Sequence, residues 1–124
     1  MEEIRSLIGL SPSSIEACEI REGVIRSNEQ IFCAYKGVRD SFIITSKRIL
    51  CVNKQGVTGK KQDYLSIPVS NIQAFSFETA GTIDLDSEIK IYVSGLGQLK
   101  IRISRPTSNI DPIVDALNTL KIDI

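Results

Sequence analysis

The stretch LDSEIKIYVSGLGQLKIRIS, residues 85–104, alternates apolar and polar side chains on both sides of a central Gly95-Leu96-Gly97. A period of two is typical of strands with one buried and one wet face, and the glycine pair is typical of a tight turn. The stretch therefore predicts a β-hairpin with apolar positions on one face. The expected cross-strand pairs are Val93 with Leu99, Ile91 with Ile101, Ile89 with Ile103, and Lys90 with Arg102.

Strand patterns continue upstream of the hairpin, and a helix pattern follows it. Five further short strands are expected at residues 31–36, 41–45, 48–52, 64–67 and 71–79, each bounded by polar or glycine-containing turns. Downstream, Asn109 is a good N-cap and Pro112 falls in the first helical turn. The apolar stripe of that helix consists of Ile110, Ile113, Val114, Leu117 and Leu120. Seven antiparallel strands and one amphipathic helix predict a mainly β fold, an open barrel capped by the C-terminal helix.

The first part of the chain has a different pattern. Apolar residues at helical spacing predict one short helix over residues 2–8. Ser13 and Glu16 match a capping box and predict a second helix over residues 13–22, ended by Gly23. We therefore expect an N-terminal helical segment at residues 1–27 and a single domain at residues 28–124.

The composition excludes several classes of function. The 124 residues carry 15 Lys and Arg against 15 Asp and Glu, so no polybasic arm is present and no nucleic-acid partner is expected. There is no histidine, and Cys18, Cys33 and Cys51 form no Cys-x-x-Cys pair, so neither a metal site nor a disulfide framework is expected. We accordingly expect no catalytic residues and no cofactor. The absence of a secretory pattern at the start and of a long apolar run predicts a cytoplasmic protein.

Two of the expected strands are apolar on both faces. Residues 42–44 and 49–52 have no polar alternation, so both faces of these strands need a cover. The N-terminal helices could supply the outer cover, or the same surface of another copy could. On the second interpretation the subunit interface would include Phe42, Ile44, Ile49 and Cys51.

Two charged groups are candidate binding elements. The basic cluster comprises Lys47, Arg48, Lys54, Lys60 and Lys61. It would attract anionic headgroups or a partner's carboxylates, although lysines in polar loops also serve solubility. The acidic run at residues 84–88 does not fit an EF-hand, because Ile89 stands where a glycine is needed. We expect Glu78, Asp84 and Asp86 either to solvate a sheet edge or to pair with Lys or Arg of a neighbouring subunit.

Four segments carry a family resemblance: Lys36–Asp40, Thr45–Leu50, Asn53–Lys61 and Phe75–Ile91. They resemble the short bacterial proteins with a pleckstrin-homology-like domain, over roughly residues 28–121. The resemblance implies two near-orthogonal antiparallel sheets capped by the C-terminal helix, a non-catalytic role and ring-like homo-oligomers. Lipid-binding members place a lysine and two more basic residues around the first hairpin loop. The corresponding turn of this chain has only Lys36 and Arg39, which disfavours phosphoinositide specificity.

These observations lead to an expected function. The chain is interpreted as a non-enzymatic bacterial interaction or scaffold module that assembles into a homo-oligomer and that can bind another protein. The alternative is a peripheral module whose basic loops touch anionic membrane lipid. An enzyme is the third and least supported interpretation, because no nucleophile is accompanied by an obvious base.

Overall fold

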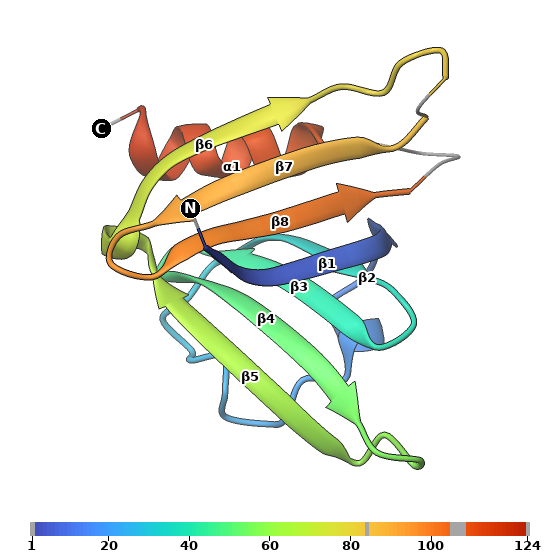
Figure 1. Cartoon of the computed structure of the whole chain (residues 1–124). Helices are drawn as coiled ribbons and strands as arrows, with labels where there is room; N and C mark the ends of the chain where they lie inside the picture. Colours follow the sequence, from blue (N-terminus) through green and yellow to red (C-terminus); the bar gives the residue numbers. More distant parts are fainter. Residues whose placement is uncertain (1, 84, 105–108, 124) are drawn as a thin grey trace.

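The computed structural model describes residues 2–83, 85–104 and 109–123, and Figure 1 shows the whole chain. Its elements are the strands β1 (Glu3–Pro12), β2 (Ile31–Lys36), β3 (Asp40–Thr45), β4 (Arg48–Gln55), β5 (Lys61–Pro68), β6 (Ile72–Glu78), β7 (Ser87–Val93) and β8 (Gly97–Ile103). Two 3₁₀ turns, η1 (Glu16–Cys18) and η2 (Val69–Asn71), and one α-helix, α1 (Asp111–Lys121), complete the described fold.

The strands form one eight-stranded sheet in the order β5-β4-β3-β2-β1-β8-β7-β6. Neighbouring strands are antiparallel, with the exception of β1 and β8, which are parallel. The strands β5 and β6 are therefore the two edges, and they do not pair with each other. The expected pleckstrin-homology-like barrel with a C-terminal helix is confirmed, as a large sheet that does not close.

The expected N-terminal helix over residues 2–8 is wrong, because these residues form β1. The first part of β1 pairs with β8, and its last residues, Ser11 and Pro12, pair with β2. Within the pairing with β8 the register shifts between Leu7 and Leu10, and Gly9 has a φ of 70°, a left-handed conformation that few other residues adopt. The helical spacing of the apolar residues did not lead to a helix here. Without β1, the backbone N–H and C=O groups along one edge of β2 and of β8 would be unpaired, and a strand at this position provides their hydrogen-bond partners.

The second expected helix is reduced to one turn. Only residues 16–18 are helical, and Glu19 ends the turn with a φ of 54°. The capping box of Ser13 and Glu16 is not formed. Instead, the Ser14 hydroxyl accepts a hydrogen bond of 3.2 Å from the backbone N–H of Ala17. The rest of the segment up to β2 is irregular chain.

The hairpin of β7 and β8 is confirmed, but its register is shifted by two residues. The observed pairs are Val93 with Gly97, Ile91 with Leu99, Ile89 with Ile101, Lys90 with Lys100 and Glu88 with Arg102. A tighter turn than expected causes the shift. Because two residues is one full repeat of a strand, the same side chains remain on the buried face.

The C-terminal helix is confirmed and packs on the sheet (Figure 1). The expected N-cap is wrong by one residue, because Ile110 occupies the N-cap without a side-chain cap, although the side chain of Asn109, one residue before it, accepts a hydrogen bond of 3.1 Å from the N–H of Asp111. The buried side chains of Ile110, Ile113 and Leu117 join the main core, and Val114 and Leu120 pack against its rim. The expected apolar stripe therefore faces the sheet.

The outer face of β3 and β4 is covered by the chain's own N-terminal segment. Ile43, Leu50 and Val52 form a second apolar cluster with Cys18 and Ala34. The residues that pack over this cluster from the N-terminal segment are Ile15, Ile20, Val24 and Ile25. Of the two expected covers, the structure therefore shows the one from the same polypeptide, as irregular chain rather than as helices.

This arrangement corrects part of the expected subunit interface. Phe42, Ile44, Ile49 and Cys51 point into the main core and are 0% exposed. They alternate along β3 and β4 with the residues under the N-terminal segment, so each strand is apolar on both faces for reasons internal to one chain. These four side chains offer no surface to a second copy.

Candidate functional site

The expected basic cluster is divided between the two ends of β4. Lys47 and Arg48 lie at the turn before β4, and Lys54, Lys60 and Lys61 lie near the turn after it. Arg48 pairs with Pro68 and Gln55 pairs with Lys61 in the antiparallel ladder. Seven residues of strand separate the two groups by roughly 20–25 Å. They are therefore two surfaces, not one patch.

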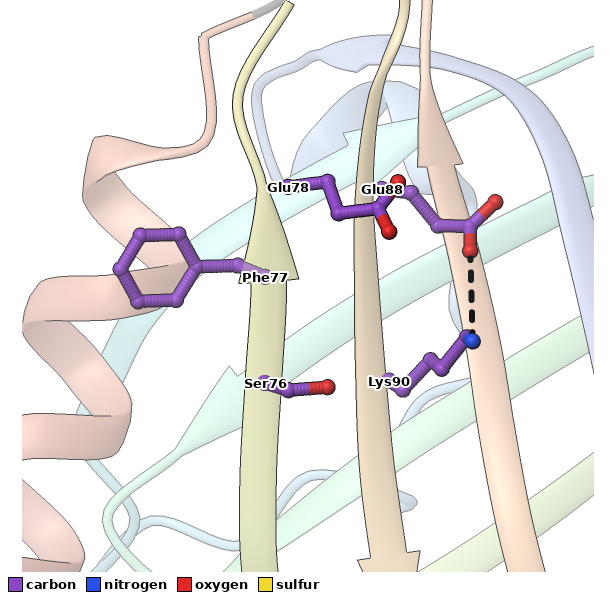
Figure 2. Close-up of a pocket in the computed structure, with 5 residues that line it drawn as sticks. All are labelled: Ser76, Phe77, Glu78, Glu88 and Lys90. Carbon is purple, nitrogen blue, oxygen red and sulfur yellow. Dashed lines mark ion pairs between the residues drawn. The ribbon is translucent and has the colours of Figure 1, made fainter.

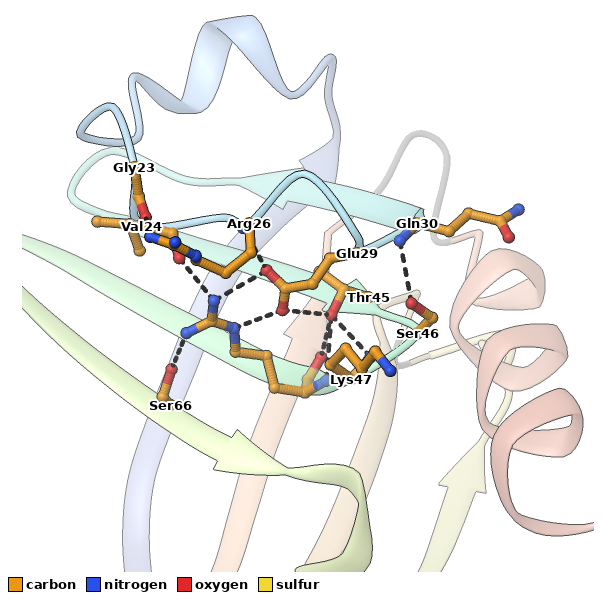
Figure 3. A network of polar contacts seen from close by, with 10 residues as sticks. Gly23, Val24, Arg26, Glu29, Gln30, Thr45, Ser46, Lys47 and Ser66 are labelled. Atoms are coloured by element: carbon orange, nitrogen blue, oxygen red, sulfur yellow. Dashed lines mark hydrogen bonds and ion pairs between the residues drawn. The ribbon is translucent and has the colours of Figure 1, made fainter.

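At the first end, Arg48 is held by a network around Glu29 (Figure 3). Its Nε and Nη2 donate to the two carboxylate oxygens of Glu29 at 2.7 and 2.8 Å. Its Nη2 also donates to the carbonyl of Val24 at 2.6 Å, and its Nη1 donates to the hydroxyl of Ser66 at 2.8 Å. The network joins the irregular N-terminal segment to β4 and β5.

Glu29 is an ionised carboxylate in a nearly closed environment. Its side chain is only 3% exposed. Its oxygens also accept hydrogen bonds from the backbone N–H of Arg26 at 2.7 Å and from the hydroxyl of Thr45 at 3.2 Å. The hydrogen bonds from Arg48, with those of Arg26 and Thr45, lower the pKa of Glu29 to about 2 against the opposing effect of burial. The same pair raises the pKa of Arg48.

A groove of about 300 Å³ opens beside this network. Its walls combine cationic side chains with the ring of Pro68 and the Ser66 hydroxyl. The lining residues are Arg26, Asn28, Glu29, Lys47, Arg48, Ser66 and Pro68.

At the second end of β4, two loop tips are joined to each other. The Nη1 of Arg39 donates to the carbonyl of Gly56 at 2.8 Å, and the N–H of Lys54 donates to the carbonyl of Arg39 at 2.8 Å. Beside these bonds, Val38 is 95% exposed and Val57 is 101% exposed. Two fully exposed apolar side chains therefore lie on adjoining loops.

The cations near these tips differ in their partners. Lys54 pairs with Glu19 at 2.7 Å, which lowers the pKa of that exposed carboxyl. In the part of the chain that the structure describes, Lys60 and Lys61 form no ion pair. This end is therefore basic as well as apolar at its tip.

The edge strand β6 carries the expected interface residue Glu78. Its cross-strand partner is another carboxylate, Glu88, and Figure 2 shows both beside Ser76, Phe77 and Lys90. Glu88 has cations within 3.9 Å, the Nζ atoms of Lys90 and Lys100. Glu78 has no cation within ion-pair distance among the described residues. Like charges placed opposite each other destabilise a ladder, so Glu78 is left with an unfavourable neighbour.

The expected interface also included Asp86 and Asp84. Asp86 pairs with the Nε of Arg102 at 3.8 Å in the same chain. Asp84 lies outside the described residues.

Apolar surface lies on the same edge strand. Phe77 is 48% exposed and points toward α1 in Figure 2, and Phe75 is half-buried. A groove of about 310 Å³ lies between this strand and the end of α1, lined by Gln73, Ala74, Phe75, Lys121 and Ile122. Sequence reasoning missed this surface, because Phe75 and Phe77 were interpreted only as part of a strand.

The described residues contain little that resembles a catalytic or metal centre. Within the described ranges, no three His, Cys, Asp or Glu side chains lie close enough together to hold a metal ion. Burial raises the pKa values of the Cys33 and Cys51 thiols to about 12, so neither is an activated nucleophile.

Within the described ranges, no helix has the length and apolar content needed to cross a membrane.

Comparison with known protein families agrees with this architecture. The family model described as "Bacterial PH domain" matches residues 5–120. The chain belongs to the bacterial PH domain family. The match begins within β1 and ends within α1, so it includes most of the strand that sequence reasoning took for a helix. The family points to a non-catalytic module.

Individual relatives are similar to this bacterial PH domain in sequence, and two solved structures are also similar in fold. An uncharacterized protein, YjqA of Bacillus subtilis (strain 168), is 43% identical over 95 residues, which are 74% of this chain and 75% of the relative. A DUF1696 family protein with a pleckstrin-homology domain from Shewanella loihica PV-4 is 33% identical, with a TM-score of 0.76 over 92% of this chain and 98% of the other. A pleckstrin homology domain from Shewanella amazonensis SB2B is 40% identical, with a TM-score of 0.65 over 86% of both chains.

Proposed function

We propose that this bacterial PH domain is a non-catalytic interaction module that assembles into a ring-like homo-oligomer by joining edge strand β6 of one copy to edge strand β5 of the next. The observation that carries the proposal is the open edge of β6. Its residues from Gln73 to Glu78 are exposed or half-buried, including Phe77. An unpaired strand edge with exposed aromatic residues is a template for pairing with another chain.

A contact between two different edges suits a ring. Head-to-tail contacts generate closed rings when the rotation between copies closes, whereas contacts between identical edges stop at a dimer. The sheet has two different edges, β5 and β6, at the opposite ends of its strand order. The formal net charge of zero also removes the overall repulsion between copies that a strongly charged chain would have.

The charges on the two edges are complementary. Glu78, at the end of β6, faces Glu88 and has no cation among the described side chains. Lys61, at the start of β5, is exposed and has no carboxylate partner in the same described set. An antiparallel β6–β5 contact in the register that sets Glu78 opposite Lys61 would satisfy both groups.

The test is the oligomeric mass by light scattering at low salt. We expect a multi-subunit mass for the wild-type chain, a lower mass for Glu78→Lys and for Lys61→Glu, and recovery in the double variant, since the swapped charges attract again. Glu16→Lys is the matched control, because Glu16 is exposed and lies in η1, which contacts the inner strand β2. A monomeric wild-type chain, or variants with unchanged mass, would refute the edge contact.

A second candidate function is supported by the two exposed tips. Val38 and Val57, beside Arg39, Lys60 and Lys61, form a small apolar surface with cations around it. Such a surface suits an anionic membrane, where each basic residue contributes about 1 kcal/mol. Sedimentation with anionic vesicles at two salt concentrations tests this candidate. Salt-sensitive binding that is lost in Val57→Asp and in Lys60→Gln would support it, and no binding by the wild-type chain would exclude it.

The proposed place of the module is the cytoplasm. All three cysteines are free thiols, and thiols persist in a reducing compartment. A further protein partner would bind a surface that the ring leaves free.

A further inference from the structure

Two guanidinium groups meet at the groove beside Glu29. The Nη1 of Arg26 donates to the carbonyl of Gly23 at 3.3 Å, and the Nη2 of Arg48 donates to the carbonyl of the next residue, Val24, at 2.6 Å. These carbonyls belong to consecutive residues, and both cations line the same groove. Neighbouring like charges repel unless an anion lies near both.

The carboxylate of Glu29 already accepts hydrogen bonds at both of its oxygens. Both oxygens of Glu29 bind Arg48, and one of them also accepts the backbone N–H of Arg26. The guanidinium of Arg26 has no carboxylate partner among the described residues, and neither has Lys47. Three cations and one carboxylate line the groove, which leaves a net charge of +2.

Hydrogen-bond donors remain free beside these charges. Arg48 uses four of its five N–H groups and keeps one on Nη1. The Ser66 hydroxyl accepts the bond from Arg48 and keeps its own hydrogen to donate. Arg26 uses a single N–H in the described contacts. The free donors therefore belong to Arg26, Arg48 and Ser66, and the hydrogen bonds to Glu29 hold Arg48 in place.

We propose that this groove binds the phosphate group of a small soluble phosphate monoester. A phosphate monoester carries between about −1.5 and −2 charges at neutral pH, which matches the net charge of the lining. The free N–H groups of Arg26, the remaining N–H of Arg48 and the Ser66 hydroxyl can donate to its oxygens. The groove volume of about 300 Å³ leaves room for the rest of a small molecule beside Pro68. Lys47 lines the same groove, and Figure 3 shows it on the opposite side of the network from Ser66.

The phosphate site lies away from the tips of the membrane candidate, whereas two of its lining residues, Ser66 and Pro68, belong to edge strand β5 and so lie beside the proposed contact between copies. The site lies at the start of β4, and the exposed Val38 and Val57 lie beyond the other end of that strand. A membrane bound by those tips would leave the groove facing away from the lipid headgroups. We therefore assign the groove to a soluble molecule rather than to a headgroup, and vesicles that contain phosphatidic acid test this choice.

The experiment is an NMR titration with inorganic phosphate and with glycerol 3-phosphate, at an ionic strength held constant with sodium chloride. We expect saturable shifts of amide signals around Arg26, Lys47 and Ser66, with tighter binding of glycerol 3-phosphate. Arg26→Gln should weaken binding about tenfold, which is typical for the loss of a hydrogen bond to a charged group. Lys60→Gln, with the same charge change at the other end of β4, should leave the affinity unchanged.

Other results would overturn the proposal. Amide signal shifts that do not saturate with rising phosphate concentration would mean that phosphate only screens surface charge. An equal loss of affinity in Arg26→Gln and Lys60→Gln would mean the same. Binding to vesicles that contain phosphatidic acid, without binding to either soluble phosphate, would refute the assignment to a soluble ligand. Thermal unfolding of each variant checks that the fold is retained, since Arg26 makes one weak carbonyl bond and its loss should leave the melting temperature nearly unchanged.

Discussion

The backbone N–H of Gln98 donates a hydrogen bond of 2.9 Å to the carbonyl of Glu2. The first strand of the chain therefore begins beside the turn that leads into β8. This contact starts the parallel pairing of β1 with β8, and it places β8 in the interior of the sheet, where an antiparallel hairpin alone would have left an edge. A side chain at Gly97 would overlap the carbonyl of Glu2.

Gly97→Ala should therefore destabilise the protein more than Gly95→Ala. Both glycines have a positive φ, 134° and 79°, so both variants strain the backbone. A Cβ at position 95 has nothing within 4 Å, and we expect a loss of about 1 kcal/mol there. At position 97 the clash with β1 should raise the loss to about 3 kcal/mol. Urea unfolding measures both, and equal losses would contradict the close approach of β1.

The stability of the fold should decrease in acid through Glu29. Its pKa in the folded protein is about 2, below the ordinary value of 4.5, so folding favours the ionised form. The stabilisation is complete above about pH 4.5 and is lost as the pH falls from there toward 2, with a size of about 1–3 kcal/mol. Glu29→Gln should be less stable at neutral pH and should lose less stability over this acidic range. Urea unfolding at a series of pH values tests this, and identical pH profiles would show that Glu29 is not responsible.

The apolar cover over β3 and β4 should contribute strongly to stability. Leu50 is 0% exposed under the N-terminal segment, and Leu50→Ala should cost about 2–4 kcal/mol in the free energy of unfolding. Leu96, in the turn between β7 and β8, is 56% exposed, and Leu96→Ala should change the stability by less than about 0.5 kcal/mol. A small effect of Leu50→Ala would indicate that the segment leaves this face open in solution.

The thiols should react slowly in the folded protein. Burial raises the pKa values of Cys33 and Cys51 to about 12, so the thiolate fraction at neutral pH is very small, and Cys18 is 0% exposed. A thiol reagent such as Ellman's reagent should modify all three cysteines promptly only after denaturation. Rapid modification of the native protein would show that the N-terminal segment opens readily, because Cys18 lies beneath it.

The elements that sequence reasoning predicted correctly are those whose patterns are local. The alternation around Gly95 and Gly97 is sufficient for the β7–β8 hairpin, and the stripe from Ile110 to Leu120 is sufficient for α1. The register of the hairpin was wrong by two residues because the turn geometry, which sets the register, depends on backbone angles that the pattern does not specify. The basic cluster was divided for a related reason, since residues close in sequence can lie at opposite ends of a strand.

Composition, alternation and helical spacing thus determined by themselves that this chain is a mainly β domain with a C-terminal helix. They also determined that two of its strands, at residues 42–44 and 49–52, are apolar on both faces and must be buried on both. Only the tertiary structure decided that residues 3–12 form a strand, that residues 15–25 supply the outer cover, and that Arg26 and Arg48 meet beside Glu29. The physical reason is that side-chain periodicity is a property of neighbours along the chain. The pairing of a strand with a distant edge, and the meeting of two charges across a groove, depend instead on contacts between segments far apart in sequence.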